Sequence, residues 1–131
     1  MSARLLMVYN ADAGIAAGLL DLAHKLVSPA TYPCSLCGVT YGSLGMRAAW
    51  RAYLAALPLP VAFFHRPDFH AAYPALAAEP LPLIAGDVDG VVTILLDAAA
   101  LARLPTVAAL AAALDARLDR IALTRDAAPV P

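Results

Sequence analysis

The apolar positions of the chain alternate between short runs typical of strands and longer stripes typical of helices. Residues 4–9 are apolar after the leading arginine, as in a strand that is buried on both faces. A helix is predicted over residues 13–27, because its apolar residues recur at spacings of four, three and four. Pro29 ends that helix, since the residue before a proline is disfavoured in the α conformation.

The pattern continues with a second helical stripe and a group of short apolar runs. The segment SPATYPCSLCGVTYG (28–42) has neither helical nor strand periodicity and is predicted to be a loop. The later predicted elements are a helix over 43–57, a strand over 61–65, a short helix or irregular crossover over 66–76, apolar runs over 81–85 and 91–96, and a helix starting near Pro105. Asp89-Gly90 between the two apolar runs predicts a hairpin.

This order of elements predicts an α/β fold with a mixed four-stranded sheet. It resembles the thioredoxin-like βαβ–ββα plan, with a Cys-x-x-Cys loop and a helix inserted after the first helix. In thioredoxins and glutaredoxins the Cys-x-x-Cys opens the helix directly after the first strand, whereas residues 10–14 stand there in this chain. The resemblance also implies a cis-proline before the hairpin, at Pro80 or Pro82. Residues 1–123 are expected to form the single thioredoxin-like domain and 124–131 a flexible tail.

The chain also resembles a group of small bacterial proteins with a start like VYNADAG and a segment like SPATYPCSLCGVTYG. The resemblance spans residues 5–120, and such proteins are sometimes labelled GTPases. The phosphate-binding pattern Gly-x-x-x-x-Gly-Lys-Ser/Thr is absent from this sequence, so no nucleotide cofactor is expected. The resemblance therefore implies kinship without a mechanism.

Composition narrows the classes of function. The 131 residues are 62% hydrophobic and 15% charged, which indicates one folded domain and excludes disorder over most of the length. A net charge of -1 argues against a general nucleic-acid surface, which needs excess positive charge. No apolar run reaches the roughly 18 residues of a membrane-spanning helix, so no membrane insertion is expected. The first apolar run is also too short for a signal peptide, which predicts a cytoplasmic protein.

The two cysteines, Cys34 and Cys37, carry the strongest chemical signal. At this spacing both sulfurs can bind one metal ion, and the soft ligand set suits Cu(I) or Zn(II). His24 is the predicted third ligand, because it lies near the end of the preceding helix on a face that the cysteine loop is expected to cover. A homodimer meeting at this loop would bring four cysteines together for a shared metal or an iron–sulfur cluster. The plain alternative is that both cysteines are small buried hydrophobic residues.

The same pair supports a second hypothesis, in which Cys34 and Cys37 are the catalytic thiols of a thiol–disulfide oxidoreductase or redox sensor acting on a thiol-containing partner. The attacking thiol then needs a lowered pKa, for which Lys25 or Arg47 offers a cation. Ser43, the predicted cap of the next helix, stands six residues past Cys37, so the helix dipole is expected to contribute little.

Several further residues are candidates for a ligand pocket around this loop. They combine aromatic side chains near the cysteines with polar residues at the end of the first strand, where open α/β sheets bind ligands. These candidates are Asn10, Asp12, Tyr32, Tyr41 and Trp50. Core packing for the aromatic residues and turn chemistry for the polar ones are the plain alternatives. A third hypothesis is an interaction module without chemistry, since the alanine-rich apolar content leaves helix faces for a partner.

Overall fold

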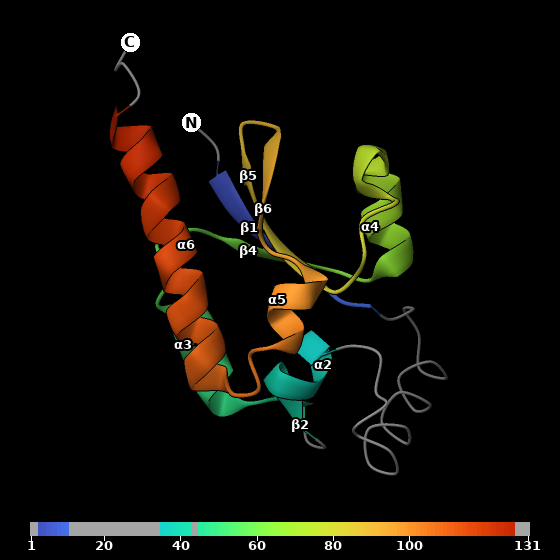
Figure 1. The fold of residues 1–131 in the computed structure, drawn as a ribbon, viewed down its shortest axis with the longest axis vertical. Coiled ribbons are helices and arrows are strands. Elements are labelled where there is room, and N and C mark those ends of the chain that lie inside the picture. Colours follow the sequence, from blue (N-terminus) through green and yellow to red (C-terminus); the bar gives the residue numbers. More distant parts are fainter. Residues whose placement is uncertain (1–2, 11–34, 43–44, 128–131) are drawn as a thin grey trace.

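A mixed four-stranded sheet forms the centre of the protein (Figure 1). The computed structural model describes residues 3–10, 35–42 and 45–127. Within the sheet the strand order is β4-β1-β5-β6, with β1 parallel to β4, β5 antiparallel to β1, and β6 antiparallel to β5. The strands are β1 (Ala3–Val8), β4 (Val61–Phe64), β5 (Leu83–Val88) and β6 (Val91–Leu96). The predicted α/β class with a mixed four-stranded sheet is therefore confirmed.

Strand β1 is the central strand and is buried on both faces, as its apolar run predicts. Residues Leu5 to Val8 are 0% exposed. Because side chains alternate across a strand, odd and even residues of β1 enter two different cores. The first core cluster contains Leu5, Met7, Tyr9, Leu36, Cys37, Trp50, Leu54, Ile84, Leu95, Leu96, Leu101, Leu110 and Leu114. The second core cluster contains Leu6, Val8, Phe69, Leu83 and Ala85.

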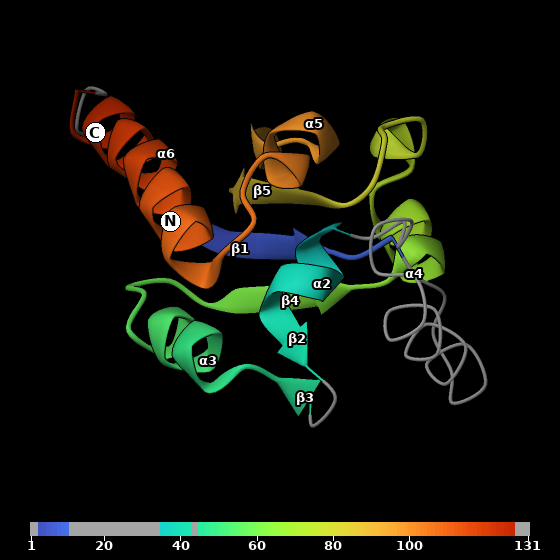
Figure 2. The same ribbon diagram turned by 60° about the horizontal axis from the view of Figure 1, so that its bottom comes forward.

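The helices divide between these two faces. Four helices contribute buried residues to the first core cluster: α2 (Ser35–Thr40), α3 (Ala48–Ala55), α5 (Ala98–Ala102) and α6 (Val107–Ala127). Helix α4 (Arg66–Ala72) supplies Phe69 to the second, and a 3-10 turn, Pro74–Leu76, follows it. Figure 2 shows α3 and α6 on one side of the molecule and α4 on the other. None of the helices within the described residues is both long and apolar enough to cross a membrane.

The β5–β6 hairpin confirms the Asp-Gly signal. Asp89 and Gly90 have φ angles of 53° and 88°, so both turn residues are left-handed, as the tight turns that match strand twist require. The Asp87 carboxylate accepts a hydrogen bond from the Gly90 N–H at 2.9 Å, which closes the turn. The Leu81–Pro82 peptide bond directly before β5 is cis, at the second of the two predicted prolines.

Residues 35–46 depart most from the sequence-based expectation. Residues 35–42 are not an irregular loop, because Ser35–Thr40 forms α2 and Tyr41–Gly42 forms β2. Strand β2 pairs with β3 (Gly45–Met46) in a small hairpin, so the helix predicted from residue 43 begins only at Ala48. Gly42 and Gly45, which flank the turn of that hairpin, are poor helix formers, so the helix does not begin at residue 43.

Two further differences concern the C-terminal half. Helix α5 was not predicted, although Asp97 caps it by accepting a hydrogen bond from the Ala100 N–H at 2.8 Å. Helix α6 continues to Ala127, four residues into the stretch expected to be a tail. The predicted helix over residues 13–27 lies outside the described residues.

Candidate functional site

Cys37 lies in helix α2, and it is disulfide-bonded. Its side chain is 8% exposed and belongs to the first core cluster, together with Tyr9 and Trp50. The only other cysteine in the sequence is Cys34, which directly precedes α2 in the chain and lies outside the described residues. The Cys-x-x-Cys motif therefore ends inside a helix that packs on the sheet, which the absence of periodicity did not predict.

Helix α2 is held at its C-terminal end. The buried Thr40 hydroxyl donates to the Leu36 carbonyl at 2.8 Å, and Leu36 itself is 1% exposed. The Arg47 backbone N–H donates to the Thr40 carbonyl at 2.8 Å, and its guanidinium Nε donates to the Val39 carbonyl at 3.0 Å. A cation is favourable there, because carbonyl groups at a helix C-terminus lack partners within the helix. Arg47 thus binds the C-terminal end of α2, whereas the sequence analysis had offered it as a cation for a thiolate.

An aromatic cluster lies at the carboxyl end of β1. The Tyr9 ring meets the Tyr41 ring edge-on at 5.6 Å between centroids, stacks on Phe63 at 6.4 Å and lies 6.4 Å from His65. Tyr9 is 4% exposed, and its hydroxyl has no hydrogen-bond partner in the described part of the chain. Burial, followed by the nearby Tyr41, raises the pKa of Tyr9 above its usual range. Tyr9 is therefore a neutral, buried phenol.

Polar groups fix the same end of the sheet. The Arg66 guanidinium donates to the Asn10 side-chain oxygen at 2.9 Å, which links the chain after β1 to the start of α4. The His65 N–H donates to the Asp68 carboxylate at 2.9 Å, as part of a capping box at the start of α4. The parallel strands β1 and β4 thus end in an ordered polar edge, where α/β sheets commonly bind ligands.

The structure places three of the eight predicted site residues among these groups. Cys37 belongs to the first core cluster with Tyr9, and Tyr41 packs against that cluster and against the Tyr9 ring. Asn10 lies at the polar edge, where it accepts the bond from Arg66. The fourth described residue, Trp50, has no exposed surface, stacks on Tyr53 at 5.2 Å and leaves its indole N–H without a hydrogen bond to any described residue. Trp50 is therefore a buried residue of the first core cluster. The remaining four, Asp12, His24, Tyr32 and Cys34, lie outside the described residues.

The described residues do not test the predicted metal site, because they include only Cys37 of its three predicted ligands. Among the described residues there is no cluster of three or more His, Cys, Asp or Glu side chains that could hold a metal ion. Two of the three predicted ligands, His24 and Cys34, are not among them. The soft-metal site therefore stays a prediction.

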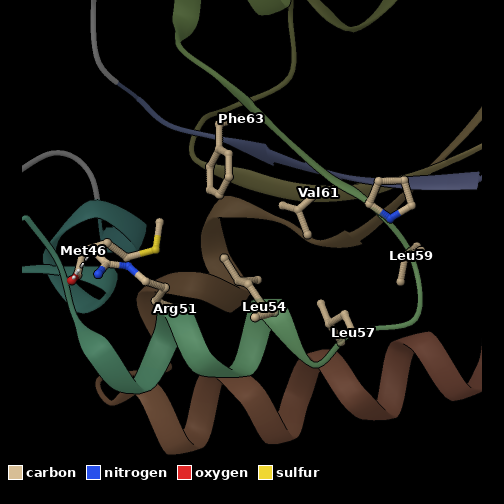
Figure 3. A pocket seen from close by; sticks show the side chains of 9 residues that line it. Met46, Arg51, Leu54, Leu57, Leu59, Val61 and Phe63 are labelled. Carbon is tan, nitrogen blue, oxygen red and sulfur yellow. Dashed lines mark hydrogen bonds between the residues drawn. The ribbon is translucent and has the colours of Figure 1, made fainter.

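Sequence reasoning missed a groove between α3 and the edge strand β4 (Figure 3). Its volume is about 380 Å³. It is lined by Met46, Arg51, Leu54, Ala55, Leu57, Leu59, Pro60, Val61 and Phe63. The available signal was the pair Val61 and Phe63, two apolar residues that share one face of a short strand. Of the predicted pocket residues that the structure describes, Asn10, Tyr41 and Trp50, none lines this groove.

No protein-family model, curated protein or solved structure matches this chain. Support for a function therefore comes from the chemistry of the described residues and from the Cys-x-x-Cys motif.

Proposed function

We propose that the chain has a thioredoxin-like fold. The supporting observation is the sheet itself, in which a parallel pair, β1 and β4, is followed by an antiparallel hairpin, β5–β6, placed beside β1, and then by the helix α6. A cis-proline precedes the hairpin at Pro82, as in members of that fold. The departure lies in the cysteine motif, which enters through α2 instead of through the helix directly after β1.

We propose further that Cys34 and Cys37 form a reversible thiol–disulfide pair, so that the protein acts as an oxidoreductase or redox sensor. The observation that carries this proposal is the disulfide-bonded state of Cys37 in a chain whose only other cysteine stands three residues earlier. Two cysteines separated by two residues in the sequence, as in Cys-x-x-Cys redox motifs, can close a small disulfide ring, so this spacing favours an internal pair over an intermolecular one.

The burial of Cys37 assigns the two roles. Cys37 as a residue is only 8% exposed, so a bulky disulfide reaches it poorly, and we therefore propose Cys37 as the resolving thiol and Cys34 as the attacking one. In the reduced protein the Cys34 thiolate attacks a partner disulfide, forms a mixed disulfide and releases the first partner thiol. The Cys37 thiolate then attacks the Cys34 sulfur, which closes the internal disulfide and releases the second partner thiol. The partner gains two electrons and two protons, and the protein loses the same.

The surroundings of Cys37 suit this second step. Cys37 lies among apolar and aromatic residues of the first core cluster, which shield it from bulky external disulfides. Helix α2 is anchored through Leu36 and through the bonds from Arg47, so the position of Cys37 is defined before any partner arrives. A resolving thiol held in place needs no rearrangement to reach the mixed disulfide.

Trapping of the mixed disulfide tests the assignment. Reduced wild-type, C34S and C37S proteins are incubated with oxidised glutathione, quenched with acid and weighed by mass spectrometry. The C37S protein should accumulate one glutathione adduct on Cys34, the wild-type protein should pass to an internal disulfide without accumulating an adduct, and C34S should react slowly. Equal adduct formation by C34S and C37S would refute the two roles.

Soft-metal binding by the same thiolates with His24 is the competing proposal, and the same proteins test it. Elemental analysis of protein purified without oxygen, in wild-type and C37S forms, measures bound copper and zinc. One metal ion per wild-type chain, lost in C37S, would favour a metal site over a redox pair. Absence of metal from the reduced wild-type protein after Zn(II) or Cu(I) titration would remove the metal hypothesis.

A further inference from the structure

The outer edge of the sheet carries unpaired backbone groups. Strand β4 is the last strand in the order β4-β1-β5-β6, and among the described strands it pairs only with β1. The Leu5 N–H donates to the Pro60 carbonyl at 2.8 Å, and the Tyr9 N–H donates to the Phe64 carbonyl at 2.9 Å. Even-numbered residues of this strand thus face β1, so alternation along a parallel ladder turns the N–H and C=O groups of Val61 and Phe63 outward. These groups have no hydrogen-bond partner within residues 3–10, 35–42 and 45–127.

The side chains of Val61 and Phe63 also line the groove. Figure 3 shows Val61 and Phe63 extending from β4 toward Leu54 on α3, and Leu57 lies on the same side of the groove as Leu54. Phe63 is 44% exposed, which makes it one of two large hydrophobic residues that the described part of the chain leaves exposed. An open strand edge and an apolar slot therefore lie side by side, which is the combination that captures an extended peptide by strand addition.

The charge at the end of the groove is positive. Arg51 lines it beside Met46, and the Arg51 guanidinium donates a long hydrogen bond, 3.5 Å, to the Met46 carbonyl (Figure 3). Arg47 and Arg51 are the only charged residues between positions 45 and 64, and neither pairs with a carboxylate within the described ranges. Arg51 is exposed at the rim of the groove, where its guanidinium can bind a carboxylate through two parallel hydrogen bonds.

We propose that the β4 edge and its groove bind an extended acidic peptide. The peptide adds a strand to β4 through the backbone groups of Val61 and Phe63, inserts an apolar side chain above Leu54 and places a carboxylate on Arg51. The site is separate from the cysteine pair in its residues, and the inference does not depend on the redox proposal.

A second copy of this chain suits the groove less well. Pairing of two β4 edges would supply no acidic residue from either groove to pair with Arg51, whose charge would stay uncompensated there. An acidic peptide instead neutralises Arg51. Charge complementarity thus selects the peptide as the occupant, and dimerisation becomes an outcome that the test can detect.

The test uses the full chain and fluorescein-labelled, amidated hexapeptides with alternating valine and threonine and two glutamates. One peptide carries the glutamates at its C-terminal end and the other at its N-terminal end, because the direction of the added strand is open. Anisotropy titrations should give saturable binding of at least one peptide, and replacement of both glutamates by glutamine should weaken binding by roughly tenfold. Failure of both acidic peptides to bind at about 1 mM would overturn the proposal.

Matched variants locate the binding. Arg51→Glu and Phe63→Glu should each weaken binding by roughly tenfold or more, since the first reverses the charge and the second removes the apolar contact. Arg103→Glu, an exposed arginine after α5, and Val91→Glu, the other exposed apolar residue on β6, should leave affinity within about twofold. Equal losses from the control variants, or undiminished binding by Arg51→Glu and Phe63→Glu, would overturn the assignment.

Hydrogen exchange distinguishes strand addition from simple occupation of the groove. Bound peptide should slow exchange of the Val61 and Phe63 amides by at least about tenfold, while the Ala62 and Phe64 amides, already facing β1, stay unchanged. Uniform change over 61–64, or protection that appears with decanoate as well as with the peptide, would contradict strand addition. Light scattering on the free protein completes the test, because a dimer abolished by Phe63→Glu would assign the edge to self-association instead.

Discussion

Phe69 is the one buried residue that helix α4 contributes to the fold, so its removal provides a sharp test of how the second core cluster is held. The side chain is 0% exposed, meets Phe64 edge-on at 6.0 Å and lies 5.5 Å from Tyr73. Replacing Phe69 by alanine removes these contacts and leaves a cavity. Such substitutions cost about 3–5 kcal/mol. That is a large part of the 5–15 kcal/mol typical of a domain, so we expect the variant to fold with much reduced stability.

Urea denaturation followed by circular dichroism measures this cost. With a slope near 2 kcal/mol per molar, the midpoint should fall by about 2 M urea. Phe63→Ala is the matched control, because Phe63 is 44% exposed and its truncation should cost only about 1 kcal/mol. Equal midpoint shifts for the two variants, or a loss below about 1.5 kcal/mol for Phe69→Ala, would refute the burial argument. The reactivity of Cys37, which lies in the other cluster, should not change.

Three other predictions concern hydrogen bonds and the hairpin turn. The hydrogen bond from the Tyr73 hydroxyl lowers the pKa of Asp87 in the folded protein. The ionised Asp87 carboxylate therefore stabilises the fold above its unfolded pKa, and this stabilisation is lost below about pH 4. In Asp87→Asn, the denaturation midpoint should fall less steeply with acid when it is measured from pH 3 to 7. Tyr53→Phe should cost about 1 kcal/mol at pH 7 in urea denaturation, because the Tyr53 hydroxyl donates to the Asp115 carboxylate at 2.7 Å; an unchanged midpoint would contradict it. Gly90→Ala should also cost about 1 kcal/mol in thermal unfolding, from the positive φ alone, since an added Cβ has no atom within 4 Å.

The sequence predicted the elements whose apolar pattern is strong and local. The buried run at β1, the strand at β4 and the Asp89-Gly90 hairpin are all confirmed. Buried strands require runs of apolar residues, and left-handed turns favour residues such as Asp-Gly, so both can be recognised in the sequence. The mixed sheet order followed from these elements and from the rule that sequential elements pack as neighbours.

The hydrophobic pattern of the sequence did not predict helix α2, which contains Cys37, or the β2–β3 hairpin that follows it. Helix α2 has six residues, and its stability comes from the burial of Leu36 and from bonds donated by Arg47, which are tertiary contacts. The groove between α3 and β4 was missed for the same reason, because residues such as Met46 and Phe63 meet only after folding. Trp50 looked like a pocket wall in the sequence, but packing placed it in the core.

The equilibrium of the cysteine pair with glutathione tests the central claim most directly. The wild-type protein is held in mixtures of reduced and oxidised glutathione, its free thiols are alkylated, and the fractions of reduced and internally disulfide-bonded chain are counted by mass spectrometry. A reversible Cys34–Cys37 pair should show a single two-electron transition within about -120 to -270 mV, and the C34S protein should show none. Thiols that stay reduced across the series, or disulfides found only between chains, would contradict it.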